Sequence, residues 1–187
     1  DILNTIGFTY KENTKDILIK YYPNHENYSL EINLEKKNIN FGNKFFFNNS
    51  KNSIQNITKA EDLVVLECVD RLLQKGYKPQ NIILEKVYPS GHGTSGRLDI
   101  LVTDNQNKAY LMIECKTWGK EFDKAFEKLK KDGGQLFTYF QHDKDAQILV
   151  LYTSSLQNKV IEYKNEIIKI EEEYKNTSNV RDFFDRW

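Results

Sequence analysis

The sequence has little of what marks secreted, zinc-binding or membrane proteins. It contains two cysteines, three prolines and one methionine among 187 residues. Cys68 and Cys115 match no zinc-ligand spacing, and isolated cysteines of this kind favour a reduced, cytoplasmic protein. No run of about 18 apolar residues occurs, which excludes a membrane-spanning helix, and the first residues have no signal-peptide pattern. We therefore expect one soluble globular domain.

A surplus of positive charge is also missing. Lys and Arg total 27, Asp and Glu total 27, and the formal net charge is zero. A protein that holds DNA by itself usually carries a basic surplus, because phosphate contacts supply much of the affinity. Neutrality therefore argues against an autonomous tight DNA binder, but it is compatible with a catalytic module whose DNA is delivered by other domains. The absence of an initiator Met favours a fragment of a larger polypeptide.

The first 57 residues form a β-rich extension in this prediction. Alternating patterns at 17–22, 28–34 and 38–41, separated by polar breaks, indicate short strands of a β meander. A polar loop at 48–53 follows the aromatic residues 45–47, which we interpret as core or as an interface to other domains. No chemistry is evident here, so we expect this segment to belong to the same domain and to cover or complete a sheet.

Residues 58–187 show alternating helix and strand patterns. Thr58 and Glu61 form a capping box for a helix that runs to Lys75 and ends at Gly76. The remaining expected elements are strands at 82–88, 97–103, 109–116 and 147–153, helices at 121–131 and 135–141, two strands or a helix after 155, and a capped helix at 179–187. This order predicts an α/β fold with a mixed central β-sheet flanked by helices.

The hairpin of strands 97–103 and 109–116 carries the chemistry. If its turn centres near Gln106, antiparallel pairing sets Asp99 opposite Ile113 or Glu114, so the carboxylates lie close enough to share a cation. Glu114 and Lys116 project from the same face of the strand. The neighbours expected to fill the other face are Leu98, Ile100, Val102, Ile113 and Cys115.

Two carboxylates at one point of a sheet repel each other unless positive charge lies between them. A hard divalent cation with oxygen ligands suits that position, and Mg²⁺ typically uses one or two protein carboxylates plus water. The backbone carbonyl of Cys115 is a candidate third ligand. Lys116 would orient or deprotonate an attacking water and stabilise charge on a phosphate. The alternative interpretation is an ordinary surface ion pair between Glu114 and Lys116.

Two segments resemble a known nuclease superfamily. Residues 96–100 (Gly-Arg-Leu-Asp-Ile) and 111–116 (Leu-Met-Ile-Glu-Cys-Lys) resemble the PD-(D/E)XK signature, with Leu98 in place of the proline. Residues 135–139 (Gln-Leu-Phe-Thr-Tyr) match the QxxxY motif of its RecB-like branch. Gln135 and Tyr139 share one helical face, which the resemblance places beside the metal site and near the DNA backbone.

The helix from Glu61 resembles the opening of nuclease domains in R subunits of type I restriction enzymes. The resemblance implies that this helix contributes a Glu to the site. Glu61 fits the position best, although it also has the capping-box explanation, and Glu67 is the competitor. Residues 61–154, roughly half of the chain, resemble the N-terminal nuclease domain of fused restriction-modification polypeptides.

The resemblance implies a restriction-endonuclease-like core and hydrolysis of double-stranded DNA with Mg²⁺, for which Mn²⁺ substitutes. Asp99, Glu114 and Lys116 would be catalytic, with Gln135 and Tyr139 shaping the site. Arg97 is interpreted either as a phosphate contact or as a solvated side chain. The implied partners are methylase or helicase domains or subunits, and cutting both strands would require two subunits to pair on DNA.

Two other functions fit the same residues. The first is a non-catalytic scaffold of PD-(D/E)XK type for DNA binding or subunit docking. The presence of Asp99, Glu114 and Lys116 argues against it, because a site that has lost its catalytic activity does not need these residues. The second is an exonuclease acting on RNA or single-stranded DNA, which would share the chemistry.

Overall fold

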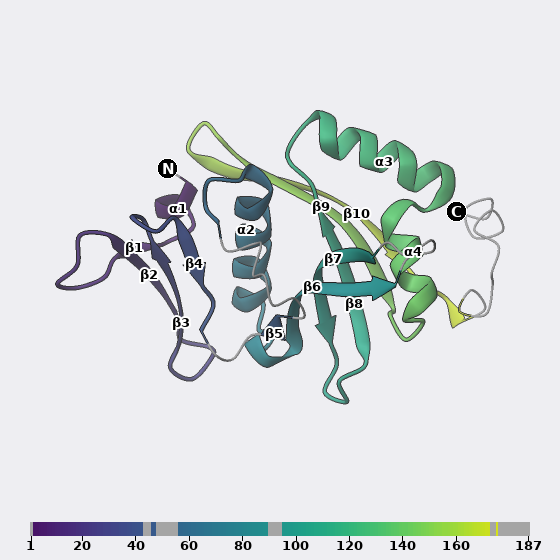
Figure 1. Ribbon diagram of the computed structural model, residues 1–187, viewed down its shortest axis with the longest axis horizontal. Helices are drawn as coiled ribbons and strands as arrows, with labels where there is room; N and C mark the ends of the chain where they lie inside the picture. Colours follow the sequence, from purple (N-terminus) through teal and green to yellow (C-terminus); the bar gives the residue numbers. More distant parts are fainter. Residues whose placement is uncertain (1, 43–45, 48–55, 90–94, 173–174, 176–187) are drawn as a thin grey trace.

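A computed structural model describes the chain except for residues 1, 43–45, 48–55, 90–94, 173–174 and 176–187. The predicted polar loop at 48–53, most of the turn before Ser95 and the predicted helix at 179–187 therefore lie outside the described residues, as does Phe45. Elements are labelled as in Figure 1.

The N-terminal segment forms a sheet of its own. A short helix α1 (Ile2–Thr5) precedes four antiparallel strands in the order β1-β2-β3-β4. Their bounds are Thr9–Tyr10 for β1, Ile17–Tyr22 for β2, Tyr28–Asn33 for β3 and Asn38–Asn40 for β4. The predicted meander is therefore confirmed. The burial of β3 alternates strictly, as expected for a strand with one face on a core.

Helix α2 (Ala60–Gln74) follows, and its C-terminus matches the prediction. Gly76 has a φ of +95°, which glycine adopts without steric cost. Its N–H donates to Leu73 O at 3.0 Å, while Tyr77 N–H donates to Leu72 O at 3.1 Å. These are the two bonds of a Schellman motif, which satisfies the last carbonyls of the helix.

The second sheet is mixed and has the order β10-β9-β8-β7-β6-β5. A 3₁₀ turn η1 (Pro79–Asn81) leads into β6. The strands are β5 (Phe46–Phe47), β6 (Ile82–Pro89), β7 (Ser95–Thr103), β8 (Ala109–Cys115), β9 (Ile148–Gln157) and β10 (Val160–Lys169). Strands β8 and β9 pair in parallel, so the chain crosses over between them through the two remaining helices, α3 (Lys120–Asp132) and α4 (Gly134–His142).

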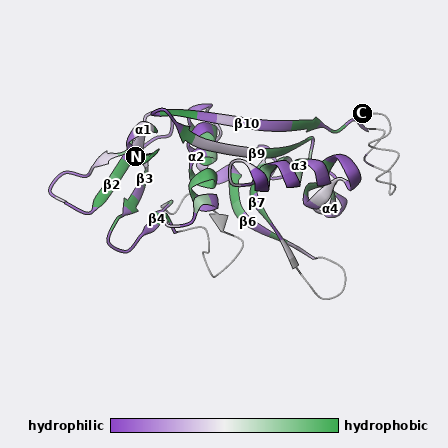
Figure 2. Ribbon diagram, turned by 90° about the horizontal axis from the view of Figure 1, so that it is seen from above, coloured by the Kyte–Doolittle hydropathy of each residue, from purple (hydrophilic) through white to green (hydrophobic). Residues whose placement is uncertain are grey.

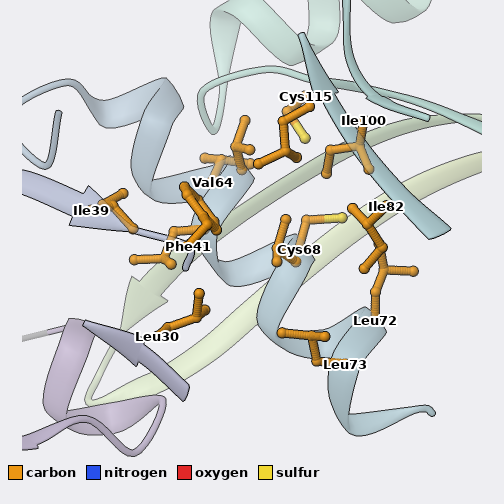
Figure 3. Packing of buried hydrophobic residues seen from close by; sticks show 14 of the residues in the cluster. Leu30, Ile39, Phe41, Val64, Cys68, Leu72, Leu73, Ile82, Ile100 and Cys115 are labelled. Atoms are coloured by element: carbon orange, nitrogen blue, oxygen red, sulfur yellow. The ribbon is translucent and has the colours of Figure 1, made fainter. Parts of the chain in front are cut away.

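These elements stack in four layers (Figures 1 and 2): the small sheet, α2, the large sheet, and then α3 with α4. One buried cluster joins the small sheet, α2 and the near face of the large sheet, as Figure 3 shows for Leu30, Cys68 and Ile100. A second cluster lies between the far face of the large sheet and α3 with α4. The described part of residues 1–57 thus covers α2 with its own sheet and adds β5 to the large one.

Most predicted elements are confirmed within two residues. The structure extends the strand predicted at 147–153 to Gln157 and makes the next segment strand β10. The helix is interrupted at Gly133 and Gly134 as expected: both have positive φ, Gly133 lies between α3 and α4, and Gly134 is the first residue of α4. The described residues include no helix with the length and apolar character needed to cross a membrane.

The shared core makes a stability prediction. Leu30 on β3 is fully buried against α2. Replacing it with Ala should lower the free energy of unfolding by about 2–5 kcal/mol, the usual cost of a cavity in a core. The change should move the urea transitions seen by far-UV circular dichroism and by tryptophan fluorescence together, because one core spans both sheets. Tyr21→Ala, at a 66% exposed position, is the control and should change stability by less than about 0.5 kcal/mol. Separate transitions in Leu30→Ala would contradict a single shared core.

Candidate active site

An open cavity of about 590 Å³ lies where α2, β6, β7, β8 and α4 meet. Two cationic side chains, Lys59 and Arg97, line it, and Lys116 lies just behind it. The carboxylates that line it come from α2 and from three neighbouring strands: Glu61, Asp62, Glu85, Asp99 and Glu114. The predicted hairpin residues and Gln135 are thus brought together with acidic residues that the sequence interpretation had not included.

Asp99 and Glu114 are adjacent across the hairpin. The ladder between β7 and β8 pairs Ile100 with Ile113, so Asp99 and Glu114 are the next residues along the two strands. Asp99 Oδ2 also accepts a 2.7 Å hydrogen bond from Cys115 N–H. Burial, and then the charge of Glu114, raise the pKa of Asp99 well above its usual value. The negative charge on each carboxylate therefore disfavours ionisation of the other.

Lys116 neutralises part of this charge. Its Nζ donates to Glu114 Oε1 at 2.7 Å and lies 3.3 Å from Glu61 Oε1. Burial alone would lower the pKa of Lys116, but the charges of Glu114, Asp99 and Glu61 and the hydrogen bond to Glu114 outweigh it and raise that pKa. The side chain is thus held as an ammonium ion between the carboxylates of Glu114 and Glu61. The prediction that Glu114 and Lys116 share one face of the strand is confirmed by their contact.

The predicted capping box at Thr58 and Glu61 is wrong. The Thr58 hydroxyl donates to Asn56 Oδ1 at 2.7 Å, and α2 begins at Ala60 with Lys59 as an N-cap that makes no side-chain hydrogen bond. Because the helix starts one residue later than the motif required, Glu61 occupies its second position and its carboxylate reaches Lys116 instead. Of the two interpretations of Glu61, the structure places it at the site.

Glu67, the competing helix residue, is not brought to the cavity. Its carboxylate accepts hydrogen bonds of 2.6 Å from both Arg71 and the Tyr152 hydroxyl. Arg71 also packs its guanidinium on the ring of Tyr163, 4.0 Å from the centroid. Glu67 therefore joins α2 to β9 directly and to β10 through Arg71, and these partners account for its burial.

Gln135 and Tyr139 lie on one face of α4 and meet the end of β7. The Tyr139 hydroxyl donates to Arg97 O at 2.8 Å and lies 3.5 Å from Gln135 Nε2. Burial first, and then the charges of Glu114 and Asp99, raise the pKa of Tyr139. Tyr139 thus keeps its proton and fixes the backbone beside Asp99, whereas Gln135 is exposed on the cavity wall.

Asp62 and Glu85 are the acidic residues that sequence reasoning missed. Burial raises the pKa of Asp62 to about 6, with Glu61 and Glu85 adding to the rise and Lys59 and the Asn56 backbone opposing it. Glu85 has a φ of +53° in the middle of β6, a conformation that is uncommon for a non-glycine residue. No motif signals either residue, since a Glu within an apolar strand and a second acid at a helix start are both ordinary.

The sheet is irregular at the same point. Ile100, Val102, Ile113 and Cys115 lie in the core on the α2 side as predicted, but Leu98 lies in the core on the α4 side. Leu98 and Ile100 are two residues apart, so the alternation of the strand breaks at Asp99. The prediction for Leu98 is wrong because regular alternation was assumed through a position where the sheet departs from it.

The donor set suits a hard divalent cation. Glu114 Oε2 is buried and lacks a hydrogen-bond partner among the described residues. Magnesium takes oxygen ligands and commonly uses one or two carboxylates plus water, which Asp99 and Glu114 can supply. The described residues contain no three His, Cys, Asp or Glu side chains that converge closely enough to hold a metal as they stand. The Lys116 ammonium occupies the space between Glu114 and Glu61, and the ligand role of the Cys115 carbonyl stays a prediction.

We compared the sequence with protein-family models and with curated proteins. No protein-family model matches the sequence, and no curated protein matches it significantly. The resemblance to PD-(D/E)XK nucleases therefore depends on the short motifs and on the geometry described above.

Gly96 lies against the ring of Tyr139. A Cβ at this position would lie 2.7 Å from Tyr139 Cε1, well inside van der Waals contact. Gly96→Ala should displace the Tyr139 ring and destabilise the protein by about 1–3 kcal/mol, as overpacking does. Tyr139→Phe, which keeps the ring but removes the hydroxyl bond to Arg97, should cost about 0.5–1.5 kcal/mol. Thermal unfolding of the two variants and the wild type measures these losses of stability. A neutral Gly96→Ala would show that the ring is not held against β7.

Proposed function

We propose that this chain is a metal-dependent nuclease domain that hydrolyses DNA phosphodiester bonds, with a restriction-endonuclease-like core. The observation that carries the proposal is the grouping of buried Glu114 with half-buried Asp99 and Lys116. Asp99 and Glu114 are neighbours on adjacent strands, and Lys116 follows directly after β8. Carboxylates held together in this way, with an ammonium group beside them, match what metal-assisted phosphoryl transfer requires. A restriction-modification polypeptide is the context that we infer from the resemblance of the motifs.

The acidic residues of the site are its candidate metal ligands. Asp99 and Glu114 supply the oxygen ligands, and Glu61 adds a third carboxylate on the solvent side with 46% of its side chain exposed. A bound Mg²⁺ would supply Lewis-acid chemistry, that is, polarisation of a phosphate oxygen and activation of water. Both carboxylates would then be ionised, because a cation reverses the effect of burial on their pKa values.

Lys116 acts as a hydrogen-bond donor in this proposal. Because its neighbours raise its pKa, its Nζ keeps its proton and is suited to orient a water or to stabilise negative charge on a phosphate oxygen. The alternative role of general base, which the sequence left open, is disfavoured by the same charges. Tyr139 and Gln135 support the site, the first through Arg97 O and the second from the cavity wall.

The charge distribution favours a module that works with other domains. The chain carries no net positive charge, and the cavity itself is rich in carboxylates. Phosphate contacts from this chain would therefore supply little of the affinity for DNA. We propose that methylase or helicase domains of the same enzyme bring double-stranded DNA to the site and that two such sites pair to cut both strands.

Cleavage by the polypeptide that carries this chain tests the proposal. Asp99→Asn and Lys116→Gln should each reduce plasmid cleavage in Mg²⁺ by on the order of a thousandfold or more, because each removes several kcal/mol of charge stabilisation. Glu121→Gln is a matched control, since Glu121 is 60% exposed on α3 and pairs with Lys124 outside the cavity. Circular dichroism verifies that the variants fold.

Unchanged cleavage by Asp99→Asn would overturn the mechanism. If the wild-type polypeptide does not cut and its chain binds neither Mg²⁺ nor Mn²⁺ in a calorimetric titration, a non-catalytic scaffold replaces the proposal. Digestion of RNA or single-stranded oligonucleotides in preference to plasmid would replace the restriction assignment with an exonuclease that uses the same residues.

A further inference from the structure

Strand β10 forms one edge of the large sheet. Among the described strands it pairs only with β9, although it runs for ten residues, whereas β5 at the opposite edge has two described residues. In Figure 2 it lies along one side of the molecule, with no other described element beyond it. An edge strand of this length offers a row of N–H and C=O groups to which a further strand can bind.

The backbone groups of β10 that point outward follow from a hydrogen bond on the other side of β9. Tyr152 of β9 lies opposite Asn165, and its carbonyl accepts a 2.9 Å hydrogen bond from Lys116 N–H on the side of β8. In an antiparallel pair, the groups of opposite residues point either toward each other or away from each other. Those of Asn165 therefore point away from β9, as do those of Tyr163 and Ile167, each two residues away.

One face of β10 exposes apolar side chains. Tyr163 and Ile167 are each 49% exposed, and they share a face because they are four residues apart in the strand. Tyr163 is held in place from the protein side, by the ring of Tyr152 and by the guanidinium of Arg71. Its outer surface is therefore a fixed apolar contact at the edge of the sheet.

The other face of β10 carries charges that alternate in sign. Glu162, Lys164 and Glu166 follow one another at intervals of two residues, and the first two are exposed. The Lys164 ammonium lies 4.5 Å from the centroid of the Trp118 ring, which keeps it at the sheet. A strand with this pattern is complementary to a second copy of itself that runs in the opposite direction.

We propose that β10 pairs with β10 of a second copy of this chain, antiparallel and with Asn165 on the twofold axis. Lys164 of each copy then lies opposite Glu166 of the other, and Tyr163 lies opposite Ile167. Opposite charges and apolar side chains at directly opposed positions both stabilise a sheet. The outward backbone groups of these apolar residues and of Asn165 would exchange hydrogen bonds across the axis.

The charges select this alignment over its neighbours. A shift of the axis to Lys164 or Glu166 sets the axis residue opposite its own copy, so that two like charges face each other. The axis at Lys164 also sets Glu162 opposite Glu166, a second repulsive pair. An axis at Tyr163 avoids like charges but limits the overlap to residues 160–166 instead of 161–169.

The same alignment places the two proposed active sites at one level of the joined sheet. Cys115, which lies between Glu114 and Lys116, pairs with Tyr152, and Tyr152 pairs with Asn165. Across the axis the row continues to Cys115 of the second copy, about five strand spacings or roughly 24 Å away. The inference thus deepens the proposed function, because it names the surface through which two sites pair. It rests on that function for its purpose but not for the pairing itself.

Sedimentation of the 187-residue chain without DNA or metal tests the pairing. One strand from each copy makes a small interface, so we expect a monomer–dimer equilibrium with a dissociation constant of about 1–100 μM. Lys164→Glu and Glu166→Lys each replace two attractive pairs by two repulsive ones and should weaken the dimer at least about tenfold. An equimolar mixture of these two variants should dimerise as the wild type does, because every facing pair is again of opposite charge.

Lys124→Glu is the matched control. It makes the same change of charge at a 73% exposed position on α3 and should leave the dimer unchanged. A wild-type chain that stays monomeric throughout this concentration range overturns the inference, as does a dimer that neither reversal weakens. A mixture that remains monomeric overturns the proposed alignment. These results leave the nuclease proposal standing, since Asp99→Asn tests that separately.

Hydrogen exchange measured by nuclear magnetic resonance locates the contact. The amides of Tyr163, Asn165 and Ile167 should exchange more slowly as the protein concentration rises, because they donate across the interface only in the dimer. The amides of Lys164 and Glu166 point toward β9 and should change little. Concentration-dependent protection that appears elsewhere and not on β10 would show that another surface forms the dimer and would overturn the inference.

Discussion

Glu114 and Asp99 place like charges next to each other on the wall of the cavity, and the rest of the site depends on how that repulsion is relieved. In the structure Lys116 and the Cys115 N–H relieve part of it, through short contacts to Glu114 and Asp99. The remaining electrostatic cost appears as the raised pKa values of both carboxyls, for which burial is the main cause. A cation is the partner that would remove this cost, because it favours the ionised form of both groups at once.

Helix α2 connects this site to the N-terminal sheet. Its first turn supplies Glu61 and Asp62, and its later turns are held from both sides. Asp70 accepts hydrogen bonds of 2.6 Å from the Tyr22 hydroxyl and from Gln74, and it pairs with Lys20 at 2.5 Å. One turn earlier in the helix, Glu67 accepts a hydrogen bond from the Tyr152 hydroxyl of β9. The small sheet is therefore part of what positions the acidic residues, even though its strands contribute none.

The break in the regular sheet at Glu85 and Asp99 has a cost and a consequence. A non-glycine residue with positive φ costs of order 1 kcal/mol, and such positions persist only where the surroundings hold them. The irregularity lies where three neighbouring strands carry Glu85, Asp99 and Glu114, all of which line the cavity. The same irregularity moves Leu98 into the core beneath α4, where Tyr139 closes the end of β7.

Local patterns in the sequence determined the elements and the hairpin. Alternating apolar and polar residues predicted β2, β3, β7 and β8. Gly76 and Gly133 predicted where α2 and α3 end. The two-residue spacing of Glu114 and Lys116 predicted that their side chains lie on the same face. Tertiary structure decided what no local pattern encodes: which helix acid reaches the site, the burial that shifts each pKa, and the inclusion of Asp62 and Glu85. The physical reason is that backbone preferences act over a few residues, whereas desolvation and charge coupling depend on groups that only packing brings together.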